Sequence, residues 1–124
     1  MRIFFLWMVG IFLLTACQKT EVKLDNFDKT LWQNDSKGCQ NIRWQMLASL
    51  EKQKDKLLGL SQEKVTEILG KPDRQDLQKR NAKRFVYYVS EGSQCGSNKT
   101  EGIALILQFG ALNYVSEIYR NRYE

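Results

Sequence analysis

Three cysteines, Cys17, Cys39 and Cys95, are the residues of this chain with the most readily assigned chemistry. A thiol can be acylated, oxidised to a disulfide or bound to a metal ion. The chain contains no histidine, so its thiolates alone leave zinc short of its usual four ligands. It also lacks the Cys-x-x-Cys spacing of redox enzymes. The sequence therefore predicts no metal site and no cofactor, and leaves acylation, disulfide formation or burial as roles for these thiols.

The segment before Cys17 has the pattern of an export signal. Arg2 supplies a positive charge, and residues 3–14 (IFFLWMVGIFLL) are apolar apart from Gly10. A helix of that length reaches about 18 Å, short of a hydrocarbon core of roughly 30 Å. A charged start, a short apolar stretch and small residues after it are typical of a secretory signal peptide. A buried N-terminal helix is the alternative, but the segment has no polar face to meet water.

The residues around Cys17 make this signal more specific. Residues 14–17 (LTAC) resemble the bacterial lipobox, in which an aliphatic and two small residues precede a cysteine. The resemblance implies that Cys17 takes a diacylglycerol, that residues 1–16 are removed and that the new amino group is acylated. Two or more acyl chains hold a protein stably at a membrane. Gln18, where aspartate often marks inner-membrane retention, leans toward the outer membrane, with the domain facing the periplasm.

Cys39 and Cys95 remain as a pair once Cys17 is acylated. An even number of cysteines in an exported chain favours a disulfide. The chain-entropy model gives about 4 kcal/mol for closing a loop as long as the one between them. Two buried free thiols are the alternative.

Charge and length describe what remains after the signal is removed. Loss of Arg2 leaves 18 basic against 14 acidic residues, a net charge of +4. This modest excess suits anionic head groups or an acidic partner, while export argues against nucleic acid. Residues 17–26 then form the acylated cysteine and a polar, flexible tether, and residues 27–124 form a single small domain.

Helices are expected in the first half of that domain. Residues 27–39 predict a short helix and a turn, and residues 41–58 predict an amphipathic helix. Ser61 suits a helix N-cap, and Gly70 followed by Pro72 ends a helix, so the next one runs over residues 61–69. Residues 73–83 are polar and are expected to form a connection.

Strands are expected in the second half. Residues 84–90 (RFVYYVS), 103–109 (IALILQF) and 114–120 (YVSEIYR) are rich in β-branched and aromatic residues. Short links between consecutive strands favour an antiparallel meander. The expected fold class is therefore α+β in two layers: two helices, plus a short N-terminal helical segment, on a three-stranded antiparallel sheet, in the order ααβββ.

Residues 59–72 (GLSQEKVTEILGKP) carry a pattern that resembles the SmpA/OmlA (BamE-like) lipoprotein domain. The matching residues are Gly59, Ser61, Val65, Leu69, Gly70 and Pro72. The likeness covers roughly residues 57–120 and implies an accessory role in inserting outer-membrane β-barrels, through contacts with sister lipoproteins and lipid. The same unit resembles repeats of the β-lactamase-inhibitor protein. Each matched residue caps, packs or stops a helix, so the pattern indicates a fold and not a binding site.

Enzyme activity is not expected. Without histidine, the usual catalytic triads and dyads lack their base. Neither the nucleophile elbow Gly-x-Ser-x-Gly nor a phosphate-binding glycine motif is present. The expected function is a lipid-anchored module that binds an envelope protein; a small binding or inhibitory protein is the alternative.

Two regions are candidate partner-binding surfaces. One is the segment with Trp32 and Trp44, where packing of Trp44 under residues 27–32 is the alternative. The other is a basic stretch, for which a solvated loop is the alternative; its residues are Arg74, Lys79, Arg80, Lys83 and Arg84. An inhibitor would instead use the outer face of the sheet, with Val86 and Tyr88, although such aromatic residues also serve simply to stabilise strands.

Overall fold

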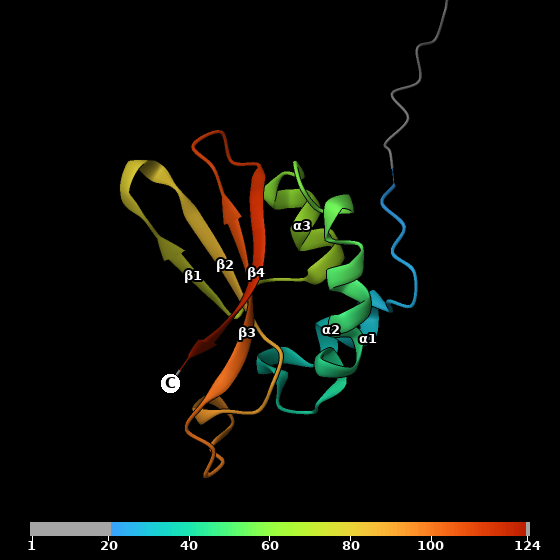
Figure 1. Cartoon of the computed structure of the whole chain (residues 1–124), viewed down its shortest axis with the longest axis vertical. Helices are drawn as coiled ribbons and strands as arrows, with labels where there is room; N and C mark the ends of the chain where they lie inside the picture. Colours follow the sequence, from blue (N-terminus) through green and yellow to red (C-terminus); the bar gives the residue numbers. More distant parts are fainter. Residues whose placement is uncertain (1–20, 124) are drawn as a thin grey trace, which may run out of the picture.

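The computed structural model describes residues 21–123, so Cys17 and the predicted signal peptide lie outside the described residues. Three helices precede four strands along the chain (Figure 1). The α+β class with two layers is confirmed. The elements are α1 (Lys29–Asn34), α2 (Ile42–Lys52), α3 (Gln62–Leu69), β1 (Arg74–Leu77), β2 (Lys83–Tyr88), β3 (Gly102–Phe109) and β4 (Val115–Tyr123).

The strands form one antiparallel sheet in the order β1-β2-β3-β4, and the helices all cover the same face of it (Figure 1). The expectation of three strands is wrong, because β1 arises from residues predicted to be a loop. Arg74 pairs with Val86 and Leu77 pairs with Lys83. A short edge strand needs only one hydrogen-bonded neighbour, so it forms without the apolar alternation that identifies an inner strand.

The turn between β1 and β2 explains how so polar a segment folds back. Arg80 and Asn81 both have left-handed backbone, with φ of 63° and 61°. Two successive residues with positive φ suit the twist of a tight hairpin. Asparagine adopts this conformation readily, whereas arginine gives no sequence signal for it.

Local capping sets the helix ends largely as the sequence predicts. Ser61 accepts a hydrogen bond from the backbone N–H of Lys64 at 3.2 Å, and α3 ends at Gly70, whose φ is 78°. Asp28 caps α1 in the same way. The helix predicted to reach residue 58 ends earlier, at Lys52, and a 3-10 turn over Lys54–Lys56 follows.

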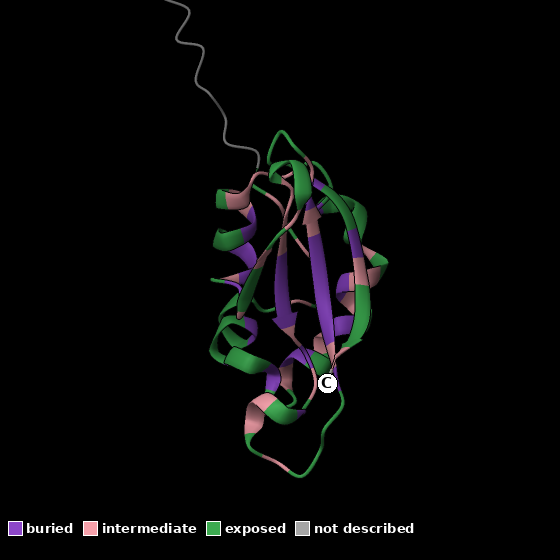
Figure 2. Ribbon diagram, turned by 90° about the vertical axis from the view of Figure 1, so that its left-hand side faces the viewer, coloured by how far each residue is buried: buried purple, intermediate pink, exposed green. Residues whose placement is uncertain are grey.

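The core lies between the helices and the face of the sheet that they cover (Figure 2). Its largest buried members come from both layers: Trp32, Leu47, Leu50, Leu57, Leu69, Tyr87, Leu105, Leu107 and Phe109. Residues 21–26, which fall in the predicted tether, lie against this core. Val22 and Leu24 pack on it, and the backbone N–H of Asp25 donates to Oε1 of Gln53 at 2.7 Å.

Candidate functional site

The disulfide predicted between Cys39 and Cys95 is confirmed. It joins the turn before α2 to the loop between β2 and β3, with a Cα–Cα distance of 5.6 Å and a sequence separation of 56. The alternative of two free thiols is thereby excluded. The bond fastens the helical layer to one end of the sheet.

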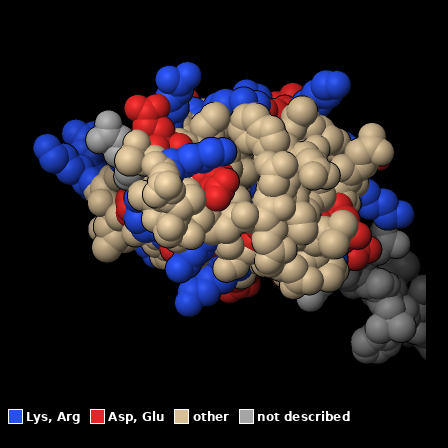
Figure 3. Space-filling model, turned by 90° about the horizontal axis from the view of Figure 1, so that it is seen from below, with Lys and Arg blue, Asp and Glu red and all other residues tan. Residues whose placement is uncertain are grey.

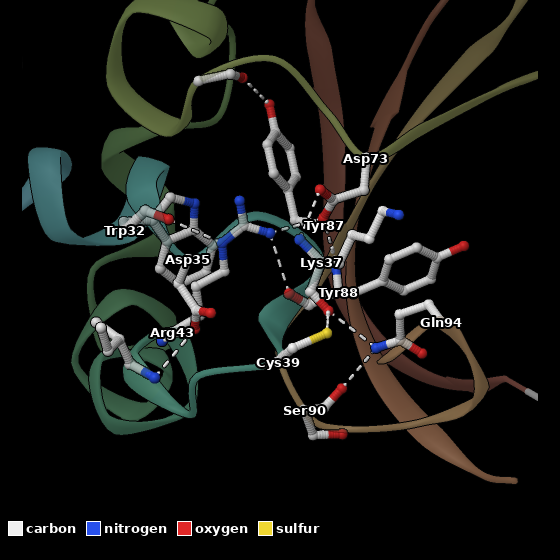
Figure 4. Close-up of polar contacts among 12 residues, drawn as sticks. Trp32, Asp35, Lys37, Cys39, Arg43, Asp73, Tyr87, Tyr88, Ser90 and Gln94 are labelled. Carbon is white, nitrogen blue, oxygen red and sulfur yellow. Dashed lines mark hydrogen bonds and ion pairs between the residues drawn. The ribbon is translucent and has the colours of Figure 1, made fainter. Parts of the chain in front are cut away.

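A buried ion pair lies close to this disulfide (Figure 4). Arg43 on α2 is only 1% exposed, and its Nη1 donates to Oδ2 of Asp73 at 2.6 Å. The same nitrogen donates to the backbone carbonyl of Tyr88, and Nε donates to that of Trp32. The guanidinium also lies 5.3 Å from the ring of Trp32. All of these contacts tie α1 and α2 to the start of β1 and the end of β2.

Backbone N–H groups donate further hydrogen bonds to the carboxylates of Asp73 and Asp35. Asp73 accepts from the N–H groups of Lys37 and Tyr88 at 3.0 and 2.9 Å. Asp35, fully buried, accepts from residues at the start of α2, including Ile42 and Arg43. This network is therefore structural. In the described part of the chain, no three Cys, Asp or Glu side chains converge in a way that would hold a metal ion.

Trp32 is not a partner-binding residue, and that prediction is corrected. Its side chain is fully buried, with its ring centroid 5.5 Å from that of Phe27 and 6.4 Å from that of Tyr87. Helix α1 turns it inward, where Arg43 covers it. Sequence spacing alone did not show which side of this short helix would be covered.

Trp44 does remain at the surface, at 40% exposure. Its ring lies 5.9 Å from the guanidinium of Arg120 on β4. Arg120 in turn forms an ion pair with Glu51, and that hydrogen bond raises the pKa of Arg120. Trp44 also borders an open groove of about 660 Å³, which the exposed Cys39 and Arg122 line as well.

The five basic residues predicted as one surface are separated by the hairpin that contains them. Arg74 and Arg84 lie on the outer face of the sheet, in register with Val86 and Asp76. Lys79 and Arg80 occupy the turn. Lys83 pairs with Leu77 on the opposite face. The stretch is therefore neither one patch nor a simple solvated loop.

The outer face of the sheet has no helix over it among the described residues (Figure 1). Three residues on this face are nevertheless buried: Val86, Ala104 and Ile106, at 1%, 2% and 5% exposure. Partly buried tyrosine rings pack against them from β2 and β4: Tyr88, Tyr119 and Tyr123. A layer of tyrosines thus forms the surface over a small apolar cluster.

Two arginines bind these tyrosines and complete what we call the Tyr–Arg face. Nη1 of Arg84 donates to the hydroxyl of Tyr119 at 3.2 Å, and Nη1 of Arg74 donates to that of Tyr88 at 3.3 Å. A hydrogen bond to Asp76 raises the pKa of Arg74. Burial raises the pKa of Tyr123 to about 12. At neutral pH Tyr123 is thus a neutral phenol and Arg74 a charged guanidinium group.

Comparison with known proteins gives no assignment: no family model matches the chain, and neither a curated protein nor a solved structure matches it significantly. Within residues 21–123, no helix has both the length and the apolar character needed to cross a membrane.

Proposed function

We propose that this chain is a non-enzymatic, lipid-anchored interaction module of the bacterial cell envelope. Acylated Cys17 holds it at the outer membrane on the periplasmic side, and the Tyr–Arg face binds an envelope protein. An accessory role in outer-membrane assembly or integrity is what the resemblance of residues 59–72 to SmpA/OmlA domains implies. Membership of that family is part of the proposal.

The observation that supports the binding role most directly is the composition of the Tyr–Arg face. Tyrosine and arginine are enriched at protein interfaces and at their energetic hot spots. Here the rings of Tyr119 and Tyr88 are already fixed by arginine side chains, so little rotamer freedom is left to lose on binding. The face also contains an apolar centre, Val86 and Ile106, under its polar groups.

The anchor is tested by labelling cells with radioactive palmitate. The wild-type chain should incorporate label, and a Cys17→Ser variant should incorporate none. Equal labelling of the two chains would overturn the anchoring proposal. The Cys39–Cys95 disulfide leaves no other free thiol in the chain to take the label.

The partner is tested by crosslinking in membranes, affinity capture and mass spectrometry. Tyr119→Ala should abolish capture of the partner, because it removes the ring that lies in register with Ile106 and accepts the hydrogen bond from Arg84. Leu31→Ala is the control, since this side chain is 48% exposed and lies on α1, in the layer on the opposite side of the sheet. Equal loss in both variants, or in neither, would count against the Tyr–Arg face.

The alternative function, a small inhibitory protein, uses the same face. Recovery of β-barrel assembly components would support the assembly role. Recovery of a single soluble enzyme, inhibited when the purified protein is added, would support the inhibitor.

A further inference from the structure

The tips of the two β-hairpins carry the most exposed large apolar side chains of the described chain. Leu77, at the end of β1, is 77% exposed, and Leu112, in the turn between β3 and β4, is 81% exposed. Tyr114 beside it is 54% exposed. The two tips adjoin, because Lys83 of one hairpin and Leu112 of the other line the same open hollow of about 340 Å³. Single exposed leucines are ordinary, but two on adjoining tips form a feature that needs an explanation.

The charged side chains within the two tips are all positive. Residues 77–83 (LQKRNAK) contain Lys79, Arg80 and Lys83 and no acidic residue, and residues 110–114 (GALNY) contain no charge. None of these three basic side chains forms an ion pair with another described residue. Glu63 is the one acidic side chain lining the hollow among residues 21–123. Unpaired cations next to apolar side chains are typical of segments that lie in the interface of an anionic membrane.

The position of the chain start agrees with this composition. Figures 1 and 2 place the beginning of the described chain at the same end of the molecule as both hairpin tips. Cys17 precedes Glu21 by four residues, which span at most about 14 Å when extended. An acyl chain on Cys17 therefore brings this end, and not the disulfide end, toward the membrane.

We propose that the hairpin-tip surface binds the head groups of an anionic membrane, with the two leucines reaching the interface. Its residues are Leu77, Lys79, Arg80, Lys83, Leu112 and Tyr114. The orientation of the domain depends on the acylated Cys17 of the proposed function, whereas the contact with the membrane is argued from the residues of the tips. The consequence is a domain held at a fixed angle, with the Tyr–Arg face open sideways to a partner on the same membrane.

A membrane suits these tips better than a folded protein does. Leu77 and Leu112 sit on separate hairpins, so a protein partner would need two apolar pockets, each surrounded by acidic groups. A fluid interface adapts to both tips and offers negative charge to every lysine and arginine at once.

The test uses the full acylated protein, purified from bacterial membranes and reconstituted into vesicles. Leu112→Cys is labelled with an environment-sensitive dye, since the disulfide and the acyl group leave no other thiol. In vesicles of phosphatidylcholine mixed with phosphatidylglycerol, the emission should shift to the blue and be quenched by brominated lipid. In phosphatidylcholine alone the shift should be absent. The same dye at Asn98→Cys, in the loop that carries Cys95, should report water in both vesicles.

A variant with three reversed charges then tests whether the cations of the tips cause the shift at residue 112. Lys79→Glu, Arg80→Glu and Lys83→Glu together should abolish the shift at residue 112 while the protein stays on the vesicles. The matched control reverses three exposed charges near the disulfide, Lys37, Lys99 and Arg122, and should keep the shift. Water-like emission from residue 112 in anionic vesicles, or loss of the shift in both sets, would overturn the proposal. Failure of the anchor is distinct, because the protein would then not float with neutral vesicles.

Discussion

The two ends of this domain, one with the Cys39–Cys95 disulfide and the other with the hairpin tips, differ in how firmly their side chains are held in place. At the first, Cys39 and Cys95 form a covalent link and Arg43 forms a buried ion pair with Asp73. At the second, leucines lie in water beside unpaired cations. Seen from the disulfide end, charges of both signs are interspersed around uncharged residues (Figure 3). Stability is therefore concentrated at one end, and the other end is left free for interaction.

The largest loss of stability is expected from Asp73→Ala. The substitution leaves the guanidinium of Arg43 buried without its counter-charge, which should lower the free energy of unfolding by about 3–5 kcal/mol. Urea denaturation measures the change. Asp76→Ala is the control, because its ion pair with Arg74 is partly exposed and should contribute at most about 1 kcal/mol. Similar losses in the two variants would show that the buried Arg43–Asp73 pair contributes no more to the free energy of unfolding than the Arg74–Asp76 pair.

The disulfide should come next. Replacing Cys39 and Cys95 together by serine should destabilise the protein by about 4 kcal/mol, the loop-closure value for this separation. Reduction of the wild-type protein with dithiothreitol should give the same shift in the urea midpoint, and reduction of the double variant should give none. A stable double variant would mean that the buried network around Arg43 and Asp73 is sufficient to stabilise this end of the domain.

A smaller effect is expected at Gly38. Its φ is +68°, and a Cβ would lie 2.5 Å from the backbone oxygen of Tyr88. Left-handed strain and overpacking together should make Gly38→Ala cost about 3 kcal/mol. Gly96→Ala separates the two causes, because Gly96 has φ of +70° and open space around it. It should lose only about 1 kcal/mol, and equal losses would argue against a close contact at Gly38.

The smallest effect on stability should come from the hairpin-tip surface. Leu77→Ser and Leu112→Ser together should change the free energy of unfolding by no more than about 0.5 kcal/mol, since both side chains are already in water. The same variant should lose the contact of the tips with anionic vesicles, although its acyl chain still holds the protein there. A marked loss of stability would show that the leucines pack against something in the free protein, which would remove the contrast between the two ends.

Much of the fold follows from local sequence. Ser61 and Gly70 define α3 by capping, and the alternation of residues 85–89 predicts which side chains face the core. The disulfide was predicted from the pair of cysteines left over if the chain is exported and acylated at Cys17. Strand β1 could not be predicted from local sequence, because Arg74 and its neighbours show no alternation of apolar residues and are held extended by pairing with β2.

The candidate site was less predictable. The sequence predicted Trp32 and Trp44 as one candidate surface, but only Trp44 is exposed, and no local pattern indicated that Trp32 is buried. Arg43 could not be recognised as a core residue, since its burial depends on Asp73, which lies 30 positions away. The Tyr–Arg face likewise joins β2 to β4, and only the strand register brings its residues together.

The most direct test of the account compares two photocrosslinking positions in living bacteria, Tyr119 on the Tyr–Arg face and Leu112 on the hairpin-tip surface. We expect a protein adduct from position 119 and a lipid adduct, without protein, from position 112. A protein adduct from position 112 together with none from position 119 would contradict it.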